Sequence, residues 1–266
     1  MIVETAAAKL NLALHVRARR PDGYHELETL FAFVEFGDSL RVQLAEADRF
    51  AISGPFAGAL GGEGDNLVTR AAARFAGRFG GGAHAITLDK RLPVASGIGG
   101  GSADAAATLR ALARLHGVDT AALFDIADAL GSDVPACLLG RTAIGRGRGE
   151  LLEPIAGLPG VPVLLVNPGV AVSTAEVFRR WDGIDRGPLG PDPLAGRNDL
   201  EGPAHAIAPV IGEVLALLAA QPGVRLARMS GSGATCFALF ETPEACTAAA
   251  SAVARPGWWV QPTRLT

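Results

Sequence analysis

The chain has 266 residues, of which 49% are hydrophobic, so it can bury the core of one large or two medium-sized domains. Its formal net charge at pH 7 is −3, and acidic and basic residues are interspersed without a block of like charge. Such a chain has no field that would attract nucleic acid or an anionic membrane, and neither is expected as a partner.

The N-terminus and the cysteines indicate where the protein works. The apolar N-terminal run is interrupted by Glu4, Lys9 and Asn11, which predicts neither a signal peptide nor a membrane span. The three cysteines form no Cys-x-x-Cys pair and have apolar neighbours, so we expect reduced, buried thiols rather than disulfides or a metal site. These features predict a cytoplasmic protein. No pattern in the sequence specifies an oligomeric state.

Residues 8–16 predict the first strand, because apolar side chains occupy every second position. Lys9 and Asn11 project together from the face opposite the leucines. This pair is either the solvated face of an edge strand or part of a functional site. Lys9 and Lys90 are the only lysines among 24 basic residues, so each marks a position where a compact positive charge is a candidate for function.

A turn and two further strands are predicted next. Residues 19–23 form the turn, in which a proline presets φ and a glycine accepts a positive φ. The turn leads directly to Tyr24, the only tyrosine of the chain, and to His25. We then expect a strand over residues 27–36 and, across a short turn, its partner over residues 39–44.

The next segment predicts a loop, a helix and a strand in that order. Residues 57–64 are a glycine-rich loop, after which Asn66 caps a helix that runs to Phe79. Residues 85–90 alternate between apolar and polar and predict a strand. An alanine-rich helix with leucines on one face follows.

A glycine-rich loop at residues 93–103 joins that strand to that helix. The unpaired N–H groups and the dipole of a helix N-terminus favour an anion, and glycines let the backbone approach its oxygens. No Gly-Lys-Ser/Thr follows, which excludes a Walker A loop. A dinucleotide fingerprint is disfavoured because Asp119 opens another helix instead of ending a second strand. The loop therefore binds nucleotide phosphates or is a flexible turn before a helix.

A helix is predicted over residues 120–130, and the run Gly-Ser-Asp-Val-Pro follows at residues 131–135. Ser132 or Asp133 can act here as an ordinary N-cap, with the proline near the first helical turn. The alternative is that Asp133 belongs to a site.

A domain boundary is predicted between residues 153 and 162, where the composition changes to turns rich in glycine and proline. Before it, residues 142–152 predict a loop or ribbon, and after it residues 163–166 predict a strand. The expected domains are residues 1–155 and residues 156–266.

The second predicted domain contains two helices and a second glycine-rich segment. A capping box at residues 173–176 opens a helix through Trp181, and residues 183–196 form an irregular loop. A helix over residues 209–220 has one continuous apolar stripe and faces the core. Residues 229–234 join two strand-like runs, either as a close-approach loop or as a plain tight turn.

Five of these segments carry a resemblance, and they are residues 8–11, 21–25, 93–107, 131–135 and 229–234. In content and order they resemble the 4-diphosphocytidyl-2-C-methyl-D-erythritol kinases, a family within the galactokinase, homoserine, mevalonate and phosphomevalonate kinase superfamily. The match spans residues 8 to about 240. The run Arg-Pro-Asp-Gly-Tyr-His at residues 20–25 separates this family from its superfamily relatives.

The resemblance implies a fold and an activity. The implied fold is a two-domain α/β (α+β) arrangement, with an N-terminal domain like a ribosomal-protein S5 module, a ferredoxin-like C-terminal domain and the active site in the cleft. The implied activity is transfer of the ATP γ-phosphoryl group to the 2-hydroxyl of the methylerythritol moiety, in the non-mevalonate route to isoprenoid precursors. Mg²⁺ would accompany ATP, and the partner would be a small molecule with a cytidine diphosphate group.

The resemblance also implies roles for individual residues. Lys9 and Asp133 match the catalytic positions. The substrate-binding positions match Asn11, Tyr24, His25, Thr174 and Phe178. The ATP-binding positions match Pro93, Val94, Ala95, Ser96, Gly97, Ile98, Gly99, Gly100, Gly101, Ser102 and Ala103. Ile98 stands where leucine is common and Ala103 where a second serine is frequent, so Ser102 alone would supply a hydroxyl.

These residue types suit phosphoryl transfer, which depends on positioning and charge stabilisation. An aspartate beside the acceptor hydroxyl can take its proton as a base or only orient it, and both roles are open. One rival is a related kinase acting on homoserine or a mevalonate derivative. Another is a nucleotide-responsive regulator without catalysis, which the presence of both Lys9 and Asp133 disfavours.

Overall fold

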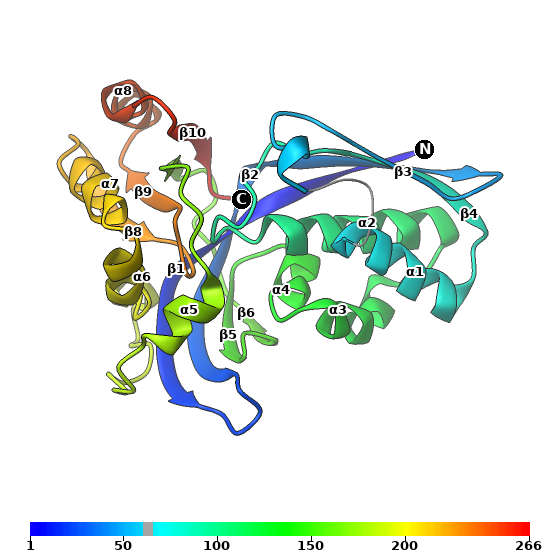
Figure 1. Cartoon of the computed structure of the whole chain (residues 1–266), viewed down its shortest axis with the longest axis horizontal. Coiled ribbons are helices and arrows are strands. Elements are labelled where there is room, and N and C mark those ends of the chain that lie inside the picture. The colour runs from blue at the N-terminus through cyan, green and yellow to red at the C-terminus, as the bar shows by residue number, and fades with distance from the viewer. Residues whose placement is uncertain (61–65) are drawn as a thin grey trace. The chain divides into compact units, whose positions relative to one another are not determined.

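A computed structural model of the chain describes residues 1–60 and 66–266 (Figure 1). Its tertiary contacts define two compact units that alternate along the chain. The first unit contains Met1–Ala8, Gly37–Val94 and Gly99–Gly140, and the second contains Lys9–Phe36, Ala95–Ile98 and Arg141–Thr266. The strands β1 (Ile2–Arg19) and β2 (His25–Ala45) each contribute residues to both units.

The first unit combines a small sheet with a group of helices. Strand β4 (Ala83–Asp89) pairs with β2 in an antiparallel manner and with β3 (Arg49–Ser53) in a parallel manner. Its helical segments are η1 (Ala57–Leu60), α1 (Leu67–Phe79), α2 (Gly100–His116), η2 (Thr120–Leu123), α3 (Phe124–Leu130) and α4 (Val134–Leu139). Helix α2 packs against α1 and α4 (Figure 1), and its buried alanines allow these close contacts.

The second unit contains an antiparallel sheet of order β10-β7-β9-β8 and a two-stranded ribbon that pairs with β2 in an antiparallel manner. Its strands are β5 (Ala143–Gly147), β6 (Leu151–Pro154), β7 (Pro162–Asn167), β8 (Val224–Met229), β9 (Cys236–Phe240) and β10 (Trp259–Arg264). Its helical segments are α5 (Thr174–Arg179), η3 (Pro193–Ala195), α6 (Glu201–Ile207), α7 (Val210–Ala219) and α8 (Pro243–Val253). Helix α7 packs on β8 and β9, and α8 packs on β7 and β10, which buries the sheet's apolar side chains.

Several predicted elements are confirmed with small changes at their ends. Helix α1 begins after Asn66, whose side chain accepts hydrogen bonds from the backbone N–H groups of Val68 (2.9 Å) and Thr69 (3.1 Å). Helix α5 begins after Ser173, as the capping box predicted, but ends at Arg179 rather than at Trp181. The three cysteines are buried and free, as expected.

The predicted turn between residues 36 and 39 is wrong, because β2 runs through it without a break. A Cβ on Gly37 would overlap the Ala6 carbonyl, so this glycine permits a close approach between neighbouring backbones. Asp38 is completely buried, and its carboxylate accepts hydrogen bonds from the N–H groups of Arg91 and Leu92. The Gly37-Asp38 pair therefore has the composition of a turn, but both residues lie within a strand, where they make close backbone and hydrogen-bond contacts.

Two other predictions need smaller changes. In the glycine-rich loop expected at residues 57–64, the first four residues form η1, and residues 61–64 lie outside the described residues. The helix expected over residues 120–130 is divided into η2 and α3, with Asp119 accepting a hydrogen bond from the N–H of Ala121. The ribbon expected over residues 142–152 is the pair β5 and β6.

Candidate functional site

The glycine-rich loop leads into the N-terminus of a long helix, where Gly100 and Ser102 are half-buried and Gly101 is exposed. Gly99 adopts a left-handed conformation (φ 67°) immediately before α2, and as a glycine at the N-cap position it provides no side-chain hydrogen bond to the helix. The first intrahelical hydrogen bond is donated by Ala103 N to Gly99 O (2.8 Å). The N–H groups of the three preceding residues are therefore outside the helical ladder. This arrangement suits an anion, as the loop's composition predicted.

Within the second unit, the loop contacts the second glycine-rich segment. A Cβ on Gly97 would lie 2.5 Å from Ser230 O and 2.7 Å from Gly233 O, so only glycine fits. Thr235 N also donates a hydrogen bond to Ser96 O (3.1 Å). Residues 229–234 are thus a close-approach loop and not a plain tight turn.

Lys9 and Asn11 are buried, each with only 3% of its surface exposed, so the solvated edge-strand interpretation is wrong. Lys9 Nζ donates to Asn11 Oδ1 (2.8 Å), and Asn11 Nδ2 donates to Thr29 Oγ1 (2.7 Å). The Lys9 ammonium also lies 5.4 Å from the centre of the Phe31 ring. Burying an ammonium group costs free energy unless nearby groups compensate for its lost hydration. Asn11 and Phe31 provide such compensation, and they keep the ammonium at a defined position.

Ser230 connects the strand of Lys9 to the glycine-rich loop, a role that the sequence did not single out. Its buried hydroxyl accepts a hydrogen bond from Asn11 N (3.1 Å) and donates one to Gly97 O (3.0 Å). Lys9 N donates to Ile98 O (3.0 Å), which adds a direct link. The signal in the sequence was the Ser-Gly-Ser-Gly run that contains Ser230.

Asp133 lies in the first unit, immediately before α4, and is half-buried. Its backbone is already helical (φ −87°, ψ −13°), and its side chain makes no capping hydrogen bond. An N-cap normally has an extended backbone and accepts a hydrogen bond from the first turn. Asp133 therefore occupies the N-cap position, with the proline in the first turn as predicted, but its side chain does not act as an ordinary cap.

His25 lies among aromatic rings in the second unit. The centre of its ring lies 4.8 Å from that of Phe178 and 5.7 Å from that of Trp181, with the Trp181 ring edge to face. The sequence did not predict the contact with Trp181. His25 Nε2 is buried and has no hydrogen-bond partner among the described residues. Burial, and then the charge of Arg19, lower the pKa of His25 below its ordinary value, so the ring is neutral at physiological pH.

The remaining predicted substrate residues lie in the same unit. Tyr24 is 52% exposed, and the Arg148 guanidinium lies 5.1 Å from the centre of its ring. Thr174 and Phe178 are four residues apart on α5 and so share one face of the helix. The Thr174 hydroxyl is hydrogen-bonded to that of Ser232 (2.8 Å), in the second glycine-rich segment.

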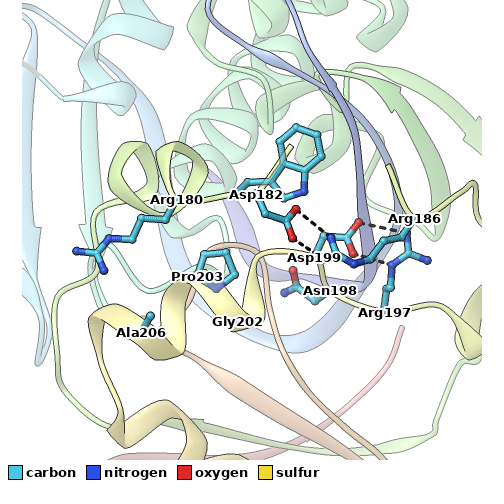
Figure 2. A pocket seen from close by; sticks show the side chains of 10 residues that line it. Arg180, Asp182, Arg186, Arg197, Asn198, Asp199, Gly202, Pro203 and Ala206 are labelled. Atoms are coloured by element: carbon cyan, nitrogen blue, oxygen red, sulfur yellow. Dashed lines mark hydrogen bonds and ion pairs between the residues drawn. The ribbon is translucent and has the colours of Figure 1, made fainter. Parts of the chain in front are cut away.

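A pocket of about 610 Å³ lies elsewhere in the second unit (Figure 2). It is lined by Arg180, Trp181, Asp182, Arg186, Arg197, Asn198, Asp199, Gly202, Pro203 and Ala206. Arg186 pairs with Asp182 (2.5 Å) and Arg197 with Asp199 (2.6 Å), as the dashed lines in Figure 2 indicate. None of the predicted site residues lines this pocket, and its own carboxylates balance these two arginines.

Known proteins share this arrangement. The model for the GHMP kinases N terminal domain matches residues 66–141, and the model for the GHMP kinases C terminal matches residues 192–257. The 4-diphosphocytidyl-2-C-methyl-D-erythritol kinase of Rhizorhabdus wittichii is 58% identical over 98% of this chain and 94% of its own length. The enzyme of that name from Novosphingobium aromaticivorans is 53% identical over 96% of this chain and 90% of its own.

The chain belongs to the 4-diphosphocytidyl-2-C-methyl-D-erythritol kinase family. A crystal structure of 4-(cytidine 5'-diphospho)-2C-methyl-D-erythritol kinase has the same fold, with a TM-score of 0.85, 40% identity and 99% coverage of both chains. As a member of this kinase family the protein is an ATP-dependent kinase, and its α/β fold with two GHMP kinase domains is the predicted one. Among the residues that the structure describes, no helix is long and apolar enough to cross a membrane.

Proposed function

We propose that the protein transfers the γ-phosphoryl group of ATP to the 2-hydroxyl of 4-diphosphocytidyl-2-C-methyl-D-erythritol, in the non-mevalonate route to isoprenoid precursors. The observation that carries this proposal is the identity of 58% over nearly the full length to a relative of that name. The buried Lys9 and Asn11 pair and the uncapped start of α2 support it, because they offer a compact cation and an anion-binding helix N-terminus.

Lys9 and Asp133 are the proposed catalytic residues. In phosphoryl transfer the protein positions the reactants and stabilises charge. The Asp133 carboxylate would orient the acceptor hydroxyl and receive its proton, and the Lys9 ammonium would balance the charge that develops. Asn11 holds the ammonium through its side-chain oxygen, so rotation of the lysine is restricted.

The proposed ATP site is the loop from Pro93 to Ala103. The N–H groups at the start of α2 would bind phosphate oxygens, and Ser102 would add its hydroxyl. A magnesium ion would be held mainly by those phosphates and would neutralise part of their charge. The described residues contain no group of three or more His, Cys, Asp or Glu side chains that could hold a metal, which is compatible with an ion that arrives with the nucleotide.

His25, Phe178 and Tyr24 are proposed to bind the cytosine. A flat base can stack on aromatic rings, and the buried Nε2 of His25 needs a hydrogen-bond partner that a base edge would supply. The neutral ring offers one donor and one acceptor. Asn11 and Thr174 would contact other parts of the same substrate.

Two further proposals concern the whole protein. We place it in the cytoplasm, which the free, buried cysteines support. We keep a boundary between domains 1–155 and 156–266 as a proposal, supported by the change in composition at residues 153–162.

A coupled ADP-release assay tests the proposed reaction with three acceptors. The cytidine-linked methylerythritol should be turned over with a kcat/KM at least about 10⁴-fold higher than for mevalonate or homoserine, because unsatisfied polar groups reject acceptors that lack the base. Higher turnover of homoserine or mevalonate would favour the rival kinases. ATP binding without turnover of any acceptor would favour the regulator.

A further inference from the structure

Three ionisable side chains are buried together in the first unit, and none of them belongs to the proposed site. Lys90, Asp38 and Asp104 have exposed fractions of 1%, 0% and 3%. Lys90 Nζ lies 2.5 Å from Asp38 Oδ2 and 2.7 Å from Asp104 Oδ2. We call these residues the buried triad.

One arm of the buried triad holds the chain where it enters the ATP loop. Asp38 Oδ1 accepts hydrogen bonds from Arg91 N (2.5 Å) and Leu92 N (2.8 Å), directly before Pro93. Its other oxygen is bound to the Lys90 ammonium. Asp38 therefore fixes two consecutive backbone N–H groups and one cation at the same time.

The other arm holds the helix that leaves the loop. Asp104 is the fifth residue of α2, and it too is bound to the Lys90 ammonium. A Cβ on Gly100 would lie 3.1 Å from Lys90 Nζ, so the ammonium packs directly against the first residue of the helix. The two ends of the loop are thus linked through one ammonium group.

Stability alone does not account for such a cluster. Burying the Lys90–Asp38 ion pair together with a third carboxyl group costs free energy that their attraction only partly returns, and apolar side chains of similar volume are often as stable or more stable. Asp104 Oδ1 has no hydrogen-bond partner among the described residues, so the cluster is not even fully satisfied. A directional ionic contact does, however, restrict geometry more tightly than apolar packing does.

We propose that the buried triad of Lys90, Asp38 and Asp104 is a positioning device for ATP binding, which keeps the entrance of the ATP loop and the start of α2 at a fixed separation. The inference rests on the proposed assignment of ATP to this loop. The three residues touch no substrate and act through the backbone N–H groups that they hold in place.

The test measures the affinity of a non-hydrolysable ATP analogue by calorimetry, together with the KM values for ATP and acceptor. The substitution Asp38→Asn replaces the carboxylate by a neutral amide, which has one acceptor oxygen and one N–H₂ group. The amide cannot accept from both the Lys90 ammonium and the two backbone N–H groups, so the contact with Lys90 is disrupted. We expect the analogue to bind about tenfold more weakly, since small misplacements of positioned groups have effects of this size or larger. The KM for the acceptor should not change.

A second variant separates positioning from stability. The triple variant Asp38→Asn, Lys90→Met and Asp104→Leu has no buried charge left in the triad, and its melting temperature should stay close to that of the wild type. Its affinity for the analogue should nevertheless fall about tenfold. The control is Phe75→Leu on α1, a fully buried core substitution at a ring that packs against Phe79 and His116, and it should lower the melting temperature.

The outcomes distinguish the two levels of the proposal. Hydrogen exchange of residues 95–103 in the wild type, with and without the analogue, reports directly whether the loop binds ATP, and an absence of protection would overturn the loop assignment and the triad inference with it. Protection in the wild type, but wild-type affinity in both triad variants, would overturn the triad inference alone. An equal loss of affinity in Phe75→Leu would also overturn it, because general destabilisation would then explain the effect.

Discussion

At the scale of single residues, burial distinguishes the proposed catalytic groups from ordinary surface side chains. Lys9 is buried against Asn11 and Phe31, and Asp133 is half-buried directly before α4, where its side chain makes no capping hydrogen bond. The alternation of residues 8–16 predicted that Lys9 and Asn11 share a face. It could not predict that this face is buried, because the residues that cover it, such as Thr29, are distant in the sequence.

We predict that Lys9→Ala and Asp133→Asn each lower kcat by at least about 10²-fold, the effect expected for positioned electrostatic or acid–base groups. Lys9→Arg should also be impaired, because a planar guanidinium cannot replace a compact ammonium beside Asn11. Steady-state kinetics on the purified variants provide the measurement. Asp125→Asn, on the exposed surface of α3, is the control and should keep wild-type activity. Near wild-type turnover in Lys9→Ala or Asp133→Asn would remove that residue from the mechanism.

The orphaned Nε2 of His25 leads to a prediction about specificity. His25→Ala should raise the KM for the cytidine-linked acceptor about tenfold or more and reduce discrimination against the uridine analogue, while the KM for ATP stays unchanged. His205→Ala, an exposed histidine on α6 of the same unit, is the matched control. If both substrates were affected alike and the melting temperature fell, His25 would only be packing against Phe178 and Trp181.

The buried triad predicts a dependence of stability on pH. Burial raises the pKa of Asp104 to about 8; Lys90 opposes this shift and Asp38 adds to it. In the unfolded chain the Asp104 carboxyl loses its proton near pH 4. Between about pH 4 and pH 8, Asp104 is therefore protonated in the folded state and ionised in the unfolded state. Asp104 therefore makes the free energy of unfolding decrease as pH rises through this window, by up to about 1.4 kcal/mol per pH unit.

Urea unfolding at several pH values between 5 and 8 measures this effect. Asp104→Asn cannot ionise, so its free energy of unfolding should depend less on pH than that of the wild type, and the two proteins should differ most near pH 8. Parallel pH profiles for the two proteins would show that Asp104 has an ordinary pKa in the folded state.

At the scale of elements, local signals predicted helices better than they predicted the course of strands. The Asn66 cap and the alternation at residues 85–90 depend on near neighbours, and α1 and β4 were correctly predicted. The Gly37-Asp38 pair was read as a turn because its composition is that of a turn. Its structure depends instead on Ala6, Lys90 and the backbone of Arg91 and Leu92, which no local pattern reveals.

The contact between the two glycine-rich segments gives a prediction at this scale. Gly97→Ala should weaken binding of the ATP analogue at least about tenfold, because the new Cβ would collide with Ser230 O and Gly233 O and displace the loop. Gly82→Ala is a close control, since Gly82 has the same φ of 77° as Gly97 but open space around its Cβ position. Equal effects of the two substitutions on the affinity would mean that backbone strain, and not the contact with Ser230 and Gly233, matters.

At the scale of the whole molecule, the motifs predicted the fold family but not the path of the chain. The order of the five segments pointed to the family, and the relatives confirm that assignment. The two contact-defined units alternate along the chain because β1 and β2 contribute to both. Composition and periodicity report only on neighbouring residues, so they cannot reveal such alternation. Helices α6 and α8 were not predicted either, since short or alanine-rich segments give weak periodic signals.

The central claim is the transfer of a phosphoryl group to the 2-hydroxyl of the cytidine-linked methylerythritol, and ³¹P nuclear magnetic resonance of the product tests it most directly. The carbon that bears this hydroxyl also bears the methyl group and carries no hydrogen. Incubation with ATP should therefore produce a new phosphomonoester signal without three-bond coupling to a carbon-bound proton, together with one equivalent of ADP. A new signal split by neighbouring CH or CH₂ protons, or ADP release without any new phosphomonoester, would contradict the claim.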